Sequence, residues 1–341
     1  MEFGSDFHTF DYPQGGNSIL SYFPESNLYA SGRQALLDLT IARGWKRLWI
    51  PSYFCEETLE CIPQAGIELC KYNITPNQEP YDIVEKIPVE KSDCLLVVNY
   101  FGLFGKRKFL NIGCEIIEDH THNLIGDWAL NSCSDWCLAS LRKTLPIADG
   151  GILWSSKHHH LPAKPPKIDI TEEVMSERVD AMNLKQRYLS GGDIEKGDFL
   201  KLFGSTEEEF DRLPISHISD LSFQIVSNLD INAWYDAKHR NWKFLYENLR
   251  DTQAVKILIP EVKSDCPFSL TLLFKDNETR NRVRKRLIDK SVYPAILWPI
   301  EDKADKDARL FGNTMLSIHC DGRYSLQDME LLLSIIKHSL T

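Results

Sequence analysis

The sequence predicts an α/β protein with a large, mostly parallel β-sheet and a smaller α+β region at the C-terminal end. Short apolar runs alternate with helical stretches as far as Trp154, and a second set of strands and helices begins near residue 268. This alternation favours parallel strands that are covered by helices on both faces. We therefore expect residues 1–214 to form a large domain, with residues 155–214 as an irregular, mobile connecting part, and residues 215–341 to form a small domain.

The elements of the large domain follow from local composition. Apolar runs that predict buried strands span residues 48–50, 67–72, 94–100, 114–118, 136–140 and 151–154. Stretches of helical composition lie between them at residues 34–43, 56–64 and 80–87. Residues 155–166 combine consecutive histidines with several prolines, so we expect no regular element there.

The second half of the chain predicts mostly helices. Residues 169–211 are highly charged, with Gly191 and Gly192 in the middle, and predict helices joined by a loop. An amphipathic pattern over residues 218–249 predicts one long helix. After it we expect strands at residues 268–274 and 315–319 and helices at residues 278–289 and 326–340, as in a small α+β domain.

Composition argues against several classes of protein. The formal net charge of −10 opposes binding to the phosphate backbone of nucleic acids. No apolar run approaches the ~18 residues of a membrane span, and the N-terminus lacks the pattern of a signal peptide. The nine cysteines are scattered without a Cys-x-x-Cys pair, which favours the cytoplasm. His158, His159 and His160 are adjacent and lack the spacing of metal ligands, so we predict no metal site.

Candidate reactive residues follow two of the predicted strands. Asp119 comes directly after the run at 114–118, and Lys143 lies three residues beyond the run at 136–140. Because ligands of open α/β sheets bind at the carboxyl ends of the strands, Asp119 and Lys143 should face one site. Pyridoxal phosphate needs an amine that holds it as an imine and a carboxylate that keeps its ring nitrogen protonated. A lysine in such a site serves as nucleophile and proton carrier.

A phosphate site is predicted upstream of these residues. Gly32 lies in a turn that opens a helix, and the backbone N–H groups at a helix start bind anions. The order of phosphate turn, aspartate and lysine along the chain therefore favours a pyridoxal-phosphate enzyme.

Several motifs support this interpretation and point to a family. They are Ser31-Gly32-Arg33-Gln34-Ala35-Leu36, Pro51-Ser52-Tyr53-Phe54-Cys55, Asn99-Tyr100-Phe101-Gly102, Glu118-Asp119-x-x-His122, Lys143 followed by Asp149-Gly150-Gly151, Leu297-Trp298-Pro299 and Asp321-Gly322-Arg323-Tyr324-Ser325. Together they resemble the fold-type-I aminotransferases, and within these the DegT/DnrJ/StrS-type sugar aminotransferases. The resemblance covers roughly residues 28–340 and implies an aspartate-aminotransferase-like large domain that binds pyridoxal phosphate.

The resemblance also implies roles for the matched residues. Lys143 would hold the cofactor as a Schiff base, Asp119 would pair with its pyridine nitrogen, and His122 would approach its phenolic oxygen. Because Cys55 occupies the usual place of the ring-stacking aromatic, stacking would fall to Phe54 or Tyr53. The implied phosphate contacts are the backbone amides of Gly32, Arg33 and Gln34 and the hydroxyl of Ser140.

For the whole protein, the resemblance implies an aminotransferase that moves an amino group from an amino-acid donor, glutamate, to a keto acceptor such as a nucleotide-linked keto sugar. It also implies a homodimer with shared active sites, in which Ser216 or His217 would replace the asparagine that reaches the phosphate bound by the partner subunit. Another pyridoxal-phosphate reaction on an amino acid, by a lyase, dehydratase or acyl transferase, is the alternative. A degenerate, non-catalytic family member is a further one, which the presence of both Lys143 and Asp119 argues against.

Overall fold

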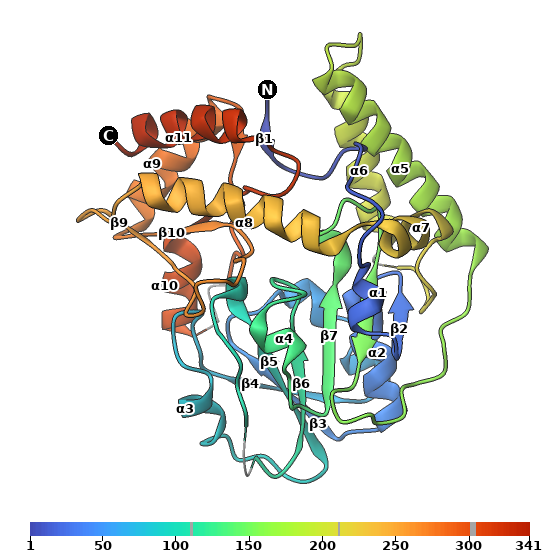
Figure 1. The fold of residues 1–341 in the computed structure, drawn as a ribbon. Helices are drawn as coiled ribbons and strands as arrows, with labels where there is room; N and C mark the ends of the chain where they lie inside the picture. The colour runs from blue at the N-terminus through green and yellow to red at the C-terminus, as the bar shows by residue number, and fades with distance from the viewer. Residues whose placement is uncertain (110–111, 211, 301–304) are drawn as a thin grey trace.

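The computed structural model is built around a seven-stranded sheet (Figure 1). It describes residues 1–109, 112–210, 212–300 and 305–341. The sheet has the order β2–β8–β7–β6–β5–β3–β4. Its strands are β2 (Ser26–Tyr29), β3 (Arg47–Pro51), β4 (Glu68–Tyr72), β5 (Asp93–Val98), β6 (Glu115–Asp119), β7 (Trp136–Ser140) and β8 (Gly151–Trp154). Only the pairs that involve β8 are antiparallel among these strands, which confirms the predicted mostly parallel sheet.

Helix α2 (Gly32–Arg43) confirms the helix that was predicted at residues 34–43. It packs against β7 and β8 through an apolar side that includes Ala35, Leu36 and Leu39. The helix predicted at 56–64 forms two 3-10 turns instead, Glu56–Leu59 and Pro63–Ala65, because Pro63 has no N–H group with which to continue an α-helix. Around the sheet lie the short helices α1 (Ile19–Tyr22), α3 (Tyr81–Val84) and α4 (Asp127–Leu130).

Two long helices pack against each other beside the sheet. They are α5 (Asp169–Leu189) and α6 (Lys196–Phe210), as Figure 1 shows. Gly191 in the connection between them has a φ of 82°, a conformation that glycine adopts readily. Residues 155–166 contain no regular element, as predicted.

The prediction of a single helix over residues 218–249 is wrong. The chain forms α7 (Asp220–Asn228) and α8 (Ile231–Asn248), with Leu229 in an extended conformation between them. The side chain of Asp230 accepts hydrogen bonds from the N–H groups of Asn232 and Ala233, at 3.1 and 3.2 Å, and so begins the second helix. The amphipathic pattern runs through the break because residues on both sides of it are buried in the same apolar cluster.

A three-stranded antiparallel sheet forms the centre of the C-terminal part. It consists of β9 (Val255–Ile257), β10 (Leu270–Phe274) and β12 (Met315–Ile318), in the order β12–β10–β9. The helices of this part are α9 (Asn277–Ile288), α10 (Lys306–Thr314) and α11 (Leu326–Leu340). The sequence did not predict α10, nor the short pair in which β1 (Phe3–Gly4) lies parallel to β11 (Val292–Tyr293).

Helix α8 joins the cores of the two parts. Its first turns bury Ile231 and Trp234 with side chains from the large sheet, whereas Trp242 and Leu245 are buried with β10 and α11. Phe3 belongs to this second core, so the N-terminus is packed into the C-terminal part. The division of the chain at residues 214 and 215 stays a prediction. Across the described ranges, no helix is long and apolar enough to cross a membrane.

Candidate functional site

A cavity of about 280 Å³ opens at the carboxyl ends of the parallel strands, where the loops after β2, β3, β6 and β7 meet. Its lining includes these residues that the sequence predicted to contact a cofactor: Gly32, Arg33, Gln34, Phe54, Asp119, His122, Ser140 and Lys143. Tyr53, the alternative to Phe54 for ring stacking, is fully buried and does not line the cavity. The lining residues come from separate segments, so the fold brings together what the strand order predicted to share one edge of the sheet. Their roles toward a cofactor stay predictions.

The start of α2 forms one wall of the cavity. Ser31 caps the helix by accepting a hydrogen bond from the Gln34 N–H at 3.1 Å. The Gln34 side chain donates to the Pro214 carbonyl at 2.8 Å and accepts from the Ser216 N–H at 3.1 Å. Gln34 therefore ties the segment at 213–216 to α2, and its backbone amide is already engaged by the cap. The positive end of the helix dipole nevertheless lies at the cavity.

Glycines allow this wall to approach the end of β7. A Cβ atom on Gly32 would lie 3.2 Å from both Cβ and N of Ser140. A Cβ atom on Gly151 would lie only 2.3 to 2.5 Å from backbone atoms of Ser31 and Gly32. Gly151 is thus required because the first turn of α2 lies directly against β8. As a result, the Ser140 hydroxyl is held beside the start of the helix.

His122 is a neutral hydrogen-bond donor in this site. Its Nδ1 accepts from the Phe101 N–H at 2.9 Å, so in the neutral ring the proton is on Nε2. Burial, with the charges of Lys143 and Lys238, lowers the pKa of His122 to about 3. The ring makes stacked contacts with Phe101 and with Trp298, whose centroids lie 5.4 and 5.6 Å from its own.

Lys143 and Asp119 both reach the cavity from strand ends. Asp119 terminates β6, and its Oδ1 accepts from the Thr121 N–H at 2.8 Å. Lys143 ends the 3-10 turn that follows β7, and its Nζ lies 5.6 Å from the ring centroid of Trp298. Burial lowers the pKa of Lys143, the positive charge of Arg142 lowers it further, and Asp119 opposes the shift. The amine therefore loses its proton more readily than an exposed lysine, as a nucleophile must.

The structure adds residues that the sequence analysis missed. Trp298 lines the cavity from the C-terminal part, and its place in a recognised motif was the available signal. Glu207 of α6 also lines it and binds Arg142 with two hydrogen bonds of 3.0 and 2.6 Å. No local pattern predicts Glu207 as a site residue, because its partner Arg142 lies 65 residues away in the sequence.

Ser216 does not fit its expected role at a subunit interface. Its side chain is 0% exposed within its own chain, and its hydroxyl accepts from the Thr171 hydroxyl at 3.0 Å. A side chain buried in this way cannot reach a second subunit. His217 is half-buried, and its N–H donates to the Pro166 carbonyl at 2.7 Å.

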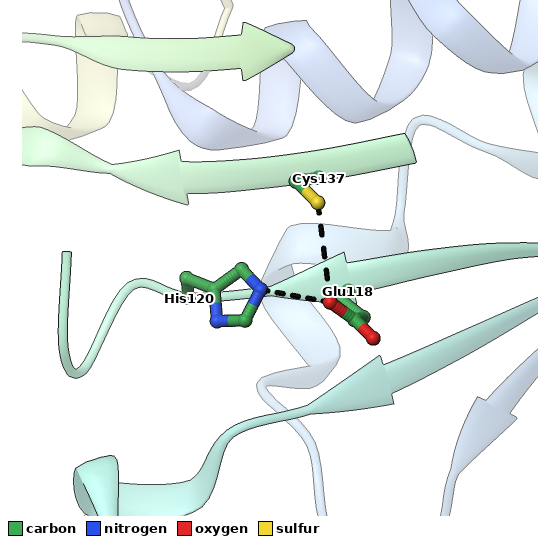
Figure 2. Close-up of side chains that lie close together, drawn as sticks. All are labelled: Glu118, His120 and Cys137. Atoms are coloured by element: carbon green, nitrogen blue, oxygen red, sulfur yellow. Dashed lines mark hydrogen bonds and ion pairs between the residues drawn. The ribbon is translucent and has the colours of Figure 1, made fainter. Parts of the chain in front are cut away.

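The opposite face of the sheet carries a second polar group. Successive side chains of a strand point to opposite faces, so Glu118 points away from the cavity that Asp119 lines. Figure 2 shows Glu118, His120 and Cys137 pointing toward one another, from β6, the loop after it and the neighbouring β7. Glu118 Oε2 lies 3.0 Å from His120 Nε2 and 3.9 Å from Cys137 Sγ. This is the one group in the described part of the chain whose His, Cys and acidic ligand atoms lie as close as a metal site requires.

We interpret this group as a buried ion pair. All three side chains are buried, and Ser132 donates a further hydrogen bond of 2.6 Å to the same Glu118 oxygen. Burial alone would lower the pKa of His120, but hydrogen bonds with Cys137 and Glu118 outweigh it and raise the pKa to about 9. His120 is therefore a cation at neutral pH and balances the Glu118 carboxylate. The absence of a metal site stays a prediction.

No protein-family model matches the sequence, and no curated protein matches it. The fold is similar to that of Spr1654 from Streptococcus pneumoniae, a protein provisionally designated a sugar aminotransferase, in its PMP form. The TM-score is 0.64 at 11% identity, and the match covers 100% of this chain and 98% of that one. PseC of Helicobacter pylori, an aminotransferase involved in the biosynthesis of pseudoaminic acid, gives a TM-score of 0.62, 11% identity and coverage of 100% and 99%. NtdA of Bacillus subtilis with bound PMP gives a TM-score of 0.61 and 10% identity, and the match covers 96% of this chain and 78% of that one. These likenesses confirm the predicted aminotransferase-like α/β fold.

The ion pair predicts how stability depends on pH. The folded pKa of His120, about 9, lies above its ordinary value of 6.5. The charged ring therefore stabilises the fold fully below pH 6.5, and this contribution is lost as the pH rises through 9. The advantage of the wild type over His120→Gln in free energy of unfolding should shrink by about 3 kcal/mol across this range. Urea unfolding at several pH values measures it, with His338→Gln, at an exposed histidine, as the control. Parallel profiles for wild type and His120→Gln would contradict the ion pair.

Proposed function

We propose that the protein is a pyridoxal-phosphate-dependent aminotransferase that transfers an amino group from an amino-acid donor to a keto acceptor. The observation that carries this proposal is the single cavity in which Lys143, Asp119 and the start of α2 meet. The bound PMP of NtdA and the PMP form of Spr1654, on the same fold, support the choice of cofactor. The sugar-aminotransferase designation of Spr1654 supports a keto sugar as the acceptor.

The residues present fit pyridoxal phosphate. The buried Lys143 amine has a lowered pKa, as the partner of an aldehyde should. The Asp119 carboxylate, held by the Thr121 N–H, suits a protonated ring nitrogen. The first turn of α2 suits a phosphate group, and the space beside Ser140 stays open because Gly32 has no side chain. We assign the phosphate contacts to the Gly32 and Arg33 amides and the Ser140 hydroxyl, since the Gln34 amide is engaged by the helix cap.

When bound, the cofactor supplies an electron sink for the carbon that carries the amino group. Lys143 Nζ would hold the cofactor and then move a proton to and from the reacting carbon of the substrate. Asp119 would keep the ring nitrogen protonated, and the His122 Nε2–H would donate to the phenolic oxygen. Phe54 and Trp298, whose ring centroids lie 5.9 Å apart, would cover the ring and exclude water.

The proposal extends to the state of the protein in the cell. We propose a homodimer with shared active sites in the cytoplasm, on the basis of the family resemblance and of cysteines that are scattered along the sequence without a Cys-x-x-Cys pair. His217 remains the candidate for a contact with the phosphate bound by the partner subunit, since Ser216 is buried in its own chain.

The first prediction concerns the attachment of the cofactor. Borohydride reduction of the purified, cofactor-saturated protein should fix pyridoxal phosphate on Lys143, because that amine lies at the strand end with a lowered pKa. Peptide mass mapping identifies the labelled residue. Lys143→Ala should lose the label, and Lys157→Ala, at an exposed lysine, should retain it. A label on another lysine, or none, would remove the basis of the proposal.

The second prediction concerns Asp119. Asp119→Asn should still take up the cofactor but transfer amine at a rate lower by roughly 100-fold or more, because an amide does not hold the ring nitrogen protonated. Amine transfer from glutamate to a panel of keto sugars and keto acids measures this rate, with Asp82→Asn, at an exposed position of α3, as the control. Comparable rates in Asp119→Asn and wild type would exclude Asp119 from the chemistry.

The third prediction concerns shared sites. His217→Ala and Lys143→Ala should each be inactive, and their mixture should regain activity. In a heterodimer, one site carries both defects and the other carries neither. Sedimentation of the mixture establishes that heterodimers are present. A monomer that is fully active at the assay concentration would contradict the shared site, whereas a proven heterodimer without activity would contradict the role of His217.

A further inference from the structure

Hydrogen bonds join the two segments that leave the sheet after β6 and β7. The backbone ladder between these strands ends where the His120 N–H donates to the Leu138 carbonyl at 2.8 Å. Strand β7 continues to Ser140, and the Ser140 N–H donates to the Thr121 hydroxyl at 2.9 Å. A side chain thus takes the place of the next backbone partner, as a buried N–H group requires. The loop after β6 is therefore held to the end of β7.

Thr144 makes a second connection between these segments. It directly follows Lys143, at the end of the 3-10 turn of residues 141–143. The Thr144 hydroxyl donates to the Thr121 carbonyl at 2.9 Å, and both side chains are more than nine-tenths buried. The Nε1–H of Trp234, in α8, donates to the Thr144 carbonyl at 3.1 Å. The loop after β6 and helix α8 thus both hold Thr144, which restricts the backbone beside Lys143.

Thr121 also holds the Asp119 carboxylate. Its N–H donates to Asp119 Oδ1 at 2.8 Å, whereas its carbonyl accepts from Thr144. Asp119 and Lys143 come from the ends of different strands, and these two hydrogen bonds connect the carboxylate to the neighbour of the lysine. A pair of groups that is held in place binds a shared ligand at a lower entropic cost than a mobile pair. The connection through Thr121 therefore preorganises the cavity.

We propose that Thr144 is a positioning residue, which fixes the spacing between Asp119 and Lys143 through its hydrogen bond to the Thr121 carbonyl. The inference rests on the proposed function, because this spacing matters only to a ligand that contacts both residues. Pyridoxal phosphate would be such a ligand, with its ring nitrogen at Asp119 and its aldehyde carbon at Lys143. Once either contact is removed, the spacing no longer affects binding. The effect of Thr144 on cofactor affinity therefore depends on the presence of Lys143.

A double-mutant cycle on cofactor binding tests this assignment. The Kd for pyridoxal phosphate is measured by fluorescence titration of the full chain after removal of the cofactor. Thr144→Val keeps the shape of the side chain and removes the donor, so the Kd should rise by about tenfold. In Lys143→Ala, which cannot attach the cofactor, adding Thr144→Val should change the Kd by less than about twofold. A general folding defect would instead raise the Kd by the same factor in both backgrounds.

Two further variants separate positioning from folding. Thr144→Ser retains the hydroxyl and should return the Kd to within about twofold of the wild type. Thr40→Val removes another buried hydroxyl, which donates to the Leu36 carbonyl inside α2, and Thr40 lies outside the lining of the cavity. This control should leave the Kd unchanged. Equal rises for Thr144→Val in the two backgrounds would overturn the proposal, and so would a wild-type Kd in Thr144→Val.

Borohydride labelling of the wild-type preparation distinguishes failure of this proposal from failure of the proposed function. Cofactor on Lys143, together with equal effects of Thr144→Val in the two backgrounds, rejects the positioning role alone. A label that is absent from Lys143 rejects the aminotransferase and the positioning role with it.

Discussion

The close approach of β8 to the start of α2 is the constraint on which the site depends. Gly151 has no side chain, so Ser31 and Gly32 lie directly against its backbone, and the Gly150 N–H donates to the Ala30 carbonyl at 2.7 Å. This contact sets the first turn of α2 beside the end of β7, and with it the distance between the helix dipole and Ser140. The Gln34 side chain then holds the segment that precedes α7. Gly151 thus sets the position of the helix start at the edge of the sheet, and Gln34 sets that of the connecting segment.

Strand β6 shows how a single sheet separates two kinds of electrostatics. Asp119 reaches the cavity, where small molecules have access, and its neighbour Glu118 is enclosed with His120 on the other face. Because side chains alternate along a strand, the two carboxylates belong to different environments although they are adjacent in sequence. The enclosed pair balances its own charge. The charged groups that act on Lys143 in the cavity include Arg142 and Glu207, which bind each other.

Local sequence patterns predicted the parts of the structure that local physics determines. The strands Trp136–Ser140 and Gly151–Trp154 and the helix Leu326–Leu340 have the bounds that their apolar patterns predicted. The break between α7 and α8 was missed because a cap is a single polar side chain inside a continuous apolar pattern. The two-residue strands β1 and β11 are too short for any periodicity to show. Site residues next to strand ends were found, whereas Glu207 was not, because its contact with Arg142 joins distant segments.

The pairing of β1 with β11 has a consequence for the order in which the chain folds. The Gly4 N–H donates to the Tyr324 hydroxyl at 2.8 Å across 320 residues, and Phe3 is buried among side chains of the last hundred or so. The segment around Gly4 is therefore synthesised long before the residues that it contacts. Contacts of such separation form slowly because a long loop must close first. During synthesis the large sheet can form before the segment around Gly4 is paired, and the C-terminal core is completed only after its own strands and helices have been made.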